Sequence, residues 1–219
     1  MKKAMFVFLA FMVMTSTCGC KKEPKLVDIY PPREYDFSSE DSFLMVSLFE
    51  DYLDRANERA LEVAKTIDSL DRGHEPSTAS IANKKNKIHV DSVMHACISL
   101  VKWHQYEAML NLLEKEQKNI YQYPGNTVGN ELPLVWLVSL LLEQRYADNK
   151  EYAYNREVAW YENVVLHMET LQALTGEECE QYEQALRELG DIYLMINWEK
   201  KYKEVIKKLE DMGRQNEEE

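Results

Sequence analysis

Few side chains in this sequence are arranged in a way that could support catalysis or metal binding. The histidines form no His-Glu-x-x-His motif, which excludes a helical zinc site of that type. They are His74, His89, His95, His104 and His167. A cluster of acids at residues 177–180 is expected in the first turn of a helix, where negative charge favours the helix dipole. The sequence has no Gly-x-Ser-x-Gly elbow and no phosphate-binding glycine loop. We therefore expect no enzyme, no catalytic residue, no metal site and no cofactor.

The thiols near the start of the chain suggest a different chemistry. Two lysines precede an unbroken apolar run over residues 4–14, and small residues then lead to Cys18, Gly19 and Cys20. A cationic start, an apolar run and a small-residue exit are the three parts of an export signal. The run is far shorter than the ~20 residues that span a bilayer. We expect residues 1–19 to be a signal peptide; a short anchor left in place is the alternative.

The end of this segment resembles the signal of bacterial lipoproteins, in which a cysteine thiol receives a diacylglyceryl group and becomes residue one after cleavage. Gly19 matches the small residue that precedes that cysteine, whereas Thr17 stands where the family usually has leucine. The resemblance implies acylation of Cys20, with Cys18 as the alternative acceptor, and a membrane anchor of palmitate-like chains. Stable anchoring needs more than one such chain. In this family an aspartate directly after the acylated cysteine favours retention in the inner membrane. Lys21 occupies that position here, so the resemblance favours the outer membrane.

The composition indicates an acidic globular protein. Hydrophobic residues make up 45% of the chain, charged residues 29%, and the formal net charge is −12. Such a charge repels phosphate backbones and anionic lipids, so we expect no nucleic acid partner and membrane attachment through the anchor alone. We expect a polar tether over residues 20–38, a single all-helical domain over 39–213 and a disordered acidic tail over 214–219.

The clearest periodic signal is a row of apolar residues spaced by three and four positions. The row comprises Val46, Phe49, Leu53, Ala56, Ala60, Val63, Ile67 and Leu70. It predicts one long amphipathic helix, opened by a capping pair at Ser38 and Asp41 and ended at Gly73. The stripe must lie against later helices or against a second copy, so a homodimer through the segment from Val46 to Leu70 is one expectation. Residues 74–87 are predicted to form a polar loop, in which residues 80–83 could make one short helix.

Three helical hairpins are predicted next, beginning near Asp91, Asn130 and Thr175, and repeated pairs of this kind suggest stacked α-solenoid units. A helix that is apolar on nearly every side, over residues 132–142, is expected at the centre. On another helical stripe, Cys97 is expected to be a buried free thiol. A disulfide with Cys179 is the alternative, since an exported compartment would permit one.

The last hairpin resembles a tetratricopeptide repeat. Leu189-Gly190 and Tyr193 match the first helix of that repeat, and residues 197–201 match its turn. Two features depart from the family: Tyr202 occupies the position of a small alanine, and the hairpins start further apart than about 34 residues. The predicted fold class is all-α, with antiparallel hairpins stacked as a tetratricopeptide-like or α-solenoid bundle after the long helix. A plain irregular helical bundle is the alternative.

A group of aromatic residues is the best candidate for a binding surface. It comprises Trp136, Tyr146, Tyr152, Tyr154, Trp160 and Tyr161. Tyrosine and tryptophan have broad apolar faces with polar tips, as binding surfaces prefer, so these residues could form a groove for a peptide or glycan. Alternatively, they fill the interface between hairpins. Because residues two apart on a helix face different ways, at least one of Tyr152 and Tyr154 should be exposed.

The sequence thus favours a lipid-anchored interaction protein of the cell envelope. In this reading a helical scaffold or adaptor binds another protein or peptide, in the secretion or assembly of envelope components. The alternative is a lipoprotein that captures a glycan or peptide substrate, or an inhibitory or immunity lipoprotein that binds a toxin.

Overall fold

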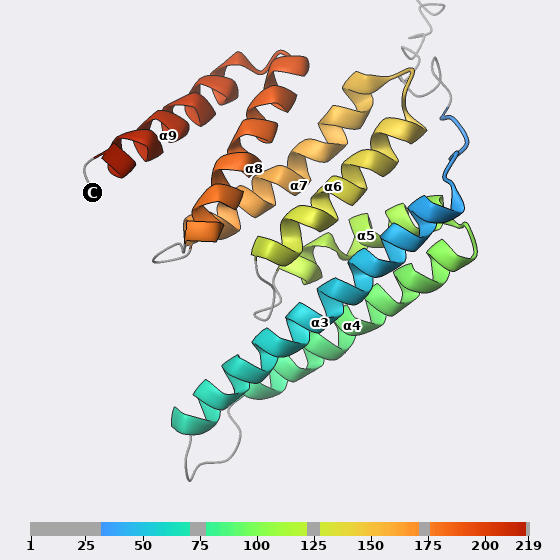
Figure 1. Cartoon of the computed structure of the whole chain (residues 1–219), viewed down its shortest axis with the longest axis vertical. Helices are drawn as coiled ribbons and strands as arrows, with labels where there is room; N and C mark the ends of the chain where they lie inside the picture. Colours follow the sequence, from blue (N-terminus) through green and yellow to red (C-terminus); the bar gives the residue numbers. More distant parts are fainter. Residues whose placement is uncertain (1–31, 71–77, 122–127, 171–175, 218–219) are drawn as a thin grey trace, which may run out of the picture.

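A computed structural model describes residues 32–70, 78–121, 128–170 and 176–217 of the chain. Over these residues the regular secondary structure consists of seven α-helices without a β-strand. The helices are α3 (Ser39–Leu70), α4 (Thr78–Lys102), α5 (Tyr106–Tyr121), α6 (Val128–Arg145), α7 (Lys150–Thr170), α8 (Gly176–Met195) and α9 (Glu199–Glu217). Helices that follow one another in the sequence pack side by side (Figure 1). The predicted all-α class of stacked antiparallel hairpins is confirmed. The predicted signal and Cys20 lie outside the described residues.

The long helix α3 packs against later helices of the same chain. It opens with the predicted cap, since the Asp41 amide donates to Ser38 Oγ at 3.1 Å and the Ser38 amide donates to Asp41 Oδ2 at 2.8 Å. The buried stripe along its first half faces α4 and α6. This stripe comprises Met45, Phe49, Tyr52, Leu53 and Ala56. The side chains of Ala60, Val63, Ile67 and Leu70 lie outside the described part.

Helix α4 begins at Thr78, so the prediction of a loop up to residue 87 is wrong for residues 78–87. These residues lack an apolar period, but lysine and alanine favour helix, and Lys87 Nζ pairs with Asp91 at 2.5 Å one turn later. Figure 1 shows α4 running alongside α3, which gives the long helix a partner of similar length.

The final residues of the predicted tether, 32–38, form a strap that packs against α5 and α6. The Arg33 amide donates to the Arg145 carbonyl at 2.8 Å, and Arg145 Nη1 donates to the Arg33 carbonyl. Asp36 and Gln144 exchange two further hydrogen bonds, at 3.2 and 3.1 Å. Arg145 is the last residue of α6, and its carbonyl has no partner within the helix. Because the strap supplies that partner, the packed structure begins earlier than the predicted boundary at residue 39.

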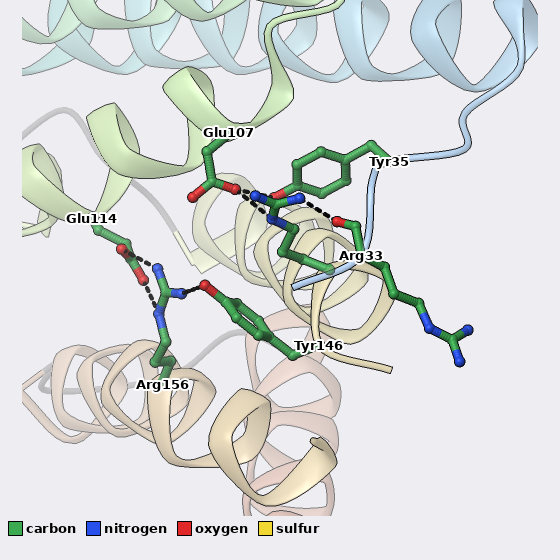
Figure 2. A network of polar contacts seen from close by, with 7 residues as sticks. Arg33, Tyr35, Glu107, Glu114, Tyr146 and Arg156 are labelled. Carbon is green, nitrogen blue, oxygen red and sulfur yellow. Dashed lines mark hydrogen bonds and ion pairs between the residues drawn. The ribbon is translucent and has the colours of Figure 1, made fainter. Parts of the chain in front are cut away.

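Tyr35 anchors the strap through its side chain (Figure 2). Its ring lies 5.7 Å from the rings of both Phe37 and Tyr106, and the Arg145 guanidinium lies 5.4 Å above it. The Tyr35 hydroxyl donates to Glu107 Oε2 at 3.3 Å, and Arg145 Nε lies 2.9 Å from the same oxygen. Burial, followed by the charge of Glu107, raises the pKa of Tyr35 far above its usual value. The hydroxyl therefore remains a protonated donor.

The turn between α4 and α5 and the turn between α8 and α9 share one backbone motif. Each ends its first helix with a residue in the left-handed region, His104 with φ of 53° and Asn197 with φ of 59°. In each turn the next amide reaches the carbonyl five positions back. These bonds join Gln105 to Leu100 and Trp198 to Tyr193, both at 2.8 Å. This is the Schellman arrangement, which satisfies carbonyls at a helix end, and it makes both turns tight.

Helix α9 packs closely on α8 at Gly190, the glycine of the Leu-Gly pair noted in the sequence. A Cβ atom at this position would meet Val205 Cγ1 at 3.4 Å and the Tyr202 ring at 3.8 Å. Helix α9 then continues to Glu217, past the expected end at Gly213 and into the segment expected to be a disordered tail. Arginine, glutamine and glutamate favour helix, which offsets the single glycine.

Helix α6 is central, as predicted, and packs against helices on both sides in the sequence. Most of its apolar residues are buried, among them Leu134, Val135, Val138, Leu141 and Leu142. Two apolar residues one turn apart are exceptions: Trp136 is 40% exposed and Leu140 is 47% exposed. None of the described helices is long and apolar enough to cross a membrane.

Candidate binding groove between α6, α7 and α8

The exposed side of α6 forms one wall of a groove with a volume of about 330 Å³. Helices α7 and α8 supply the other walls. The lining residues are Trp136, Ser139, Leu140 and Glu143 of α6, Tyr154, Glu157 and Tyr161 of α7, and Glu188, Asp191, Ile192 and Met195 of α8. Within each helix these residues recur at steps of three and four, so each helix presents one continuous face to the groove.

Three of the six aromatic residues singled out in the sequence line this groove. They are Trp136, Tyr154 and Tyr161. Trp136 is the most exposed of them, Tyr154 is half-buried, and Tyr161 is buried at 4% exposure. The Trp136 indole Nε1 donates to Glu188 Oε2 at 2.9 Å, which links α6 to α8 across the groove.

The other three aromatic residues lie elsewhere in the structure. Tyr146 and Tyr152 contact each other, with ring centroids 4.7 Å apart. The Arg156 guanidinium lies 5.3 Å from the Tyr146 ring and donates to its hydroxyl at 2.9 Å, on the side that faces α5 (Figure 2). Trp160 is buried against Tyr121. These residues therefore fill interfaces between helices. The expectation that at least one of Tyr152 and Tyr154 is exposed is wrong, because both are half-buried.

Carboxylates dominate the polar lining of the groove. Glu143 and Glu157 face Glu188 and Asp191 of the neighbouring helix, and the lining includes no lysine, arginine or histidine. Among the described residues none of these four acids takes part in an ion pair. The groove is therefore a region of concentrated negative potential.

Glu157 is the most unusual of these acids. It is only 3% exposed, and its Oε1 atom has no hydrogen-bond partner among the described residues. Burial, and next the charge of Glu143, raises the pKa of Glu157 to about 7, while the nearby Ser139 hydroxyl opposes the shift. Glu157 was not among the site residues predicted from the sequence. Its position three residues after Tyr154 and four before Tyr161 is the signal that could have placed it on the same face.

The described histidines and cysteines lie outside the groove lining. His89 Nε2 contacts Glu116 at 2.7 Å, and His167 Nδ1 contacts the fully buried Glu131 at 2.8 Å. Among the described residues no group of three histidines, cysteines or acids is placed to hold a metal ion. Cys97 and Cys179 are both free, and burial raises the pKa of Cys97 to about 12. The expectation of a buried free thiol at Cys97 is confirmed.

Comparisons of this chain with protein-family models, with curated proteins and with solved structures found no match. The groove is therefore the feature from which a function can be inferred.

Proposed function

We propose that this chain is a lipid-anchored interaction protein of the cell envelope, which binds a segment of another protein in the groove between α6, α7 and α8. The observation that carries the proposal is the face of the central helix α6 left uncovered at Trp136 and Leu140, beside the buried Glu157. Central helices of a bundle normally bury such residues, and an uncovered apolar strip rimmed by polar groups is typical of an interaction site.

The groove has the dimensions and chemistry of a site for an extended peptide segment. Its volume of about 330 Å³ lies in the range of known ligand pockets, roughly 300–1,000 Å³. Stacked helical hairpins present such surfaces along the faces of successive helices. Tyrosine and tryptophan in the lining are the residue types that contribute most to the affinity of protein interfaces.

Photo-crosslinking in the native cell envelope tests the binding site. Benzoylphenylalanine at position 140 should yield one discrete crosslinked protein, and the additional change Trp136→Ala should abolish that product. The control places the same crosslinker at Trp103, which is 77% exposed and lies in the turn between α4 and α5. Equal products at both positions would contradict a specific groove. A product with the mass of two copies of this chain would instead indicate self-association through the groove, which differs from the homodimer expected through the segment from Val46 to Leu70.

The anchor is tested separately by mass spectrometry of the amino-terminal peptide. We expect an acylated Cys20 at the start of the mature chain, with residues 1–19 removed. The variant Cys20→Ser should leave the signal uncleaved and the protein unacylated, whereas Cys18→Ser should change neither. The reverse pattern would make Cys18 the acceptor, and an unmodified thiol in both variants and in the wild type would contradict the anchor. Fractionation of the two membranes then tests the preference for the outer membrane.

A further inference from the structure

We propose that the segment bound in this groove presents a lysine or arginine side chain, whose cation lies beside Glu157 and against the aromatic rings. This inference rests on the proposed function and specifies the chemistry of the partner at the same site. Three observations carry it: the charge of the lining, the buried carboxylate and the arrangement of the aromatic and apolar residues.

The charge of the lining is not balanced within the chain. Several acids on other helix faces have basic partners: Glu107 pairs with Arg145, and Glu114 pairs with Arg156. In the groove Glu143, Glu157, Glu188 and Asp191 share one space without an ion pair among the described residues, and the groups that hydrogen-bond Glu188 are the neutral donors Trp136, Tyr161 and Gln184. Like charges held close together repel, so a cation that enters the groove gains energy from all of them.

Glu157 provides the specific contact for that cation. Glu157 lines the groove, and its Oε1 atom is buried and has no hydrogen-bond partner among the described residues. A buried polar atom of this kind destabilises the fold unless a donor reaches it. An ammonium or guanidinium group supplies both the donor and the opposite charge, and such charge-assisted hydrogen bonds are about twice as strong as neutral ones.

The remaining lining residues suit the rest of a basic side chain. Trp136, Tyr154 and Tyr161 offer aromatic rings, which attract cations through the negative face of the ring. Leu140, Ile192 and Met195 offer apolar surface for the methylene groups that precede the charge. A bare metal ion would not use this apolar surface, and among the described residues no acid cluster is placed to coordinate one.

Matched peptides test the inference on the mature chain. The probe is a short peptide with a central arginine among uncharged apolar residues, and its control carries citrulline, which keeps the shape of arginine and loses the charge. Fluorescence anisotropy should show that the arginine peptide binds about tenfold or more tightly than the citrulline peptide, as expected for a charged hydrogen bond. Equal affinity of the two peptides would overturn the inference, and so would the absence of arginine-peptide binding at about 1 mM.

Variants of the protein locate the effect in the groove. Glu157→Gln and, independently, Glu188→Gln should weaken the arginine peptide about tenfold and leave the citrulline peptide unchanged. Glu180→Gln is the matched control, because this substitution removes the same charge. Glu180 is exposed on α8 and does not line the groove. Circular dichroism checks that each variant is folded. Equal weakening by all three variants would reduce the effect to net charge and overturn the inference.

The crosslinking experiment keeps this inference separate from the proposed function. A partner protein crosslinked at position 140 together with no preference for arginine would retain the interaction protein and reject the basic side chain. The loss of both the crosslink and the preference would reject both.

Discussion

Arg156 of α7 holds Glu114 of α5 through two parallel hydrogen bonds, from Nε to Oε1 at 2.9 Å and from Nη2 to Oε2 at 2.5 Å. The third guanidinium nitrogen donates to the Tyr146 hydroxyl, so one side chain joins α5, the end of α6 and α7 (Figure 2). This planar fork is a geometry that lysine cannot reproduce.

We therefore expect Arg156→Lys to lower the free energy of unfolding by about 1–2 kcal/mol, because it loses one of two charge-assisted hydrogen bonds and the stacking on two tyrosine rings. Urea unfolding measures the change. The matched control is Arg187→Lys, since Arg187 makes an ion pair with Glu183 within the exposed face of α8. Exposed pairs of that type contribute at most about 0.5 kcal/mol. Equal effects of the two substitutions would contradict the role given to Arg156.

A second prediction concerns Glu157 and pH. Its pKa is raised from 4.5 to about 7, so the folded chain binds a proton more tightly than the unfolded chain does. The wild type should therefore lose stability as the pH rises from about 4.5 to 7. The groups that face this carboxyl are Glu143 of α6, Tyr154 and Tyr161 of α7, and Glu188 and Asp191 of α8. None of them is a cation that would reverse the sign.

The variant Glu157→Gln should lack this component of the pH dependence and should exceed the wild type in stability by about 1–3 kcal/mol above pH 7. Thermal unfolding of both proteins at several pH values between 4 and 8 measures the difference. A wild type and variant with parallel pH profiles would show that Glu157 titrates normally.

His167 and Glu131 give a third prediction. Glu131 is fully buried in the first turn of α6, and His167 of α7 lies 2.8 Å from its Oε1. We expect His167→Leu to destabilise the fold by about 3 kcal/mol, because it removes the histidine from a carboxylate that has no access to water. The double variant Glu131→Leu with His167→Leu should recover most of that loss, since two apolar residues can replace a buried pair. A double variant as unstable as the single one would contradict this reason.

The same pair has a defined dependence on pH. The hydrogen bond with Glu131 raises the pKa of His167 above its usual 6.5. The stabilisation from a protonated His167 is therefore lost as the pH rises through the raised value. Below pH 6.5 it is present as long as Glu131, whose own pKa is raised by burial, stays ionised. Nuclear magnetic resonance titration of the His167 ring measures this pKa, and Glu131→Gln should return it toward 6.5.

Gly190 gives a fourth prediction, in the stabilising direction. It lies within α8, where glycine costs about 0.5–1 kcal/mol relative to alanine. A methyl group there would meet Val205 Cγ1 at 3.4 Å, an ordinary contact distance, so Gly190→Ala should raise the free energy of unfolding by roughly that amount. Gly190→Leu should lower it, because the larger side chain cannot fit against Val205 and Tyr202. Thermal unfolding of both variants checks the opposite signs.

The sequence predicted the helices well where local signals agree. Ser38 and Asp41 carry the cap in their own side chains, and Phe49 and Leu53 belong to a stripe with a clear period. The start of α4 was missed because residues 78–87 have no apolar period, and their helix depends on the neighbouring α3. The strap was missed for a similar reason: its partners Arg145 and Gln144 are more than 100 residues away.

The candidate site was predicted only in part. Trp136, Tyr154 and Tyr161 were singled out by residue type, and the structure places them in one groove. Composition could not separate them from Tyr146 and Trp160, whose environment depends on which neighbour each helix face meets. The four acids were missed because they come from three helices, and single-helix periodicity gives no information on which faces meet.

The strap also determines where a mechanical load enters the molecule. Because Arg33 is bonded through its backbone to the last residue of α6, tension on the chain ahead of residue 32 reaches the end of α6 before it reaches the start of α3. A pull from the amino-terminal side would therefore load the strap bonds of Arg33 and Asp36 first.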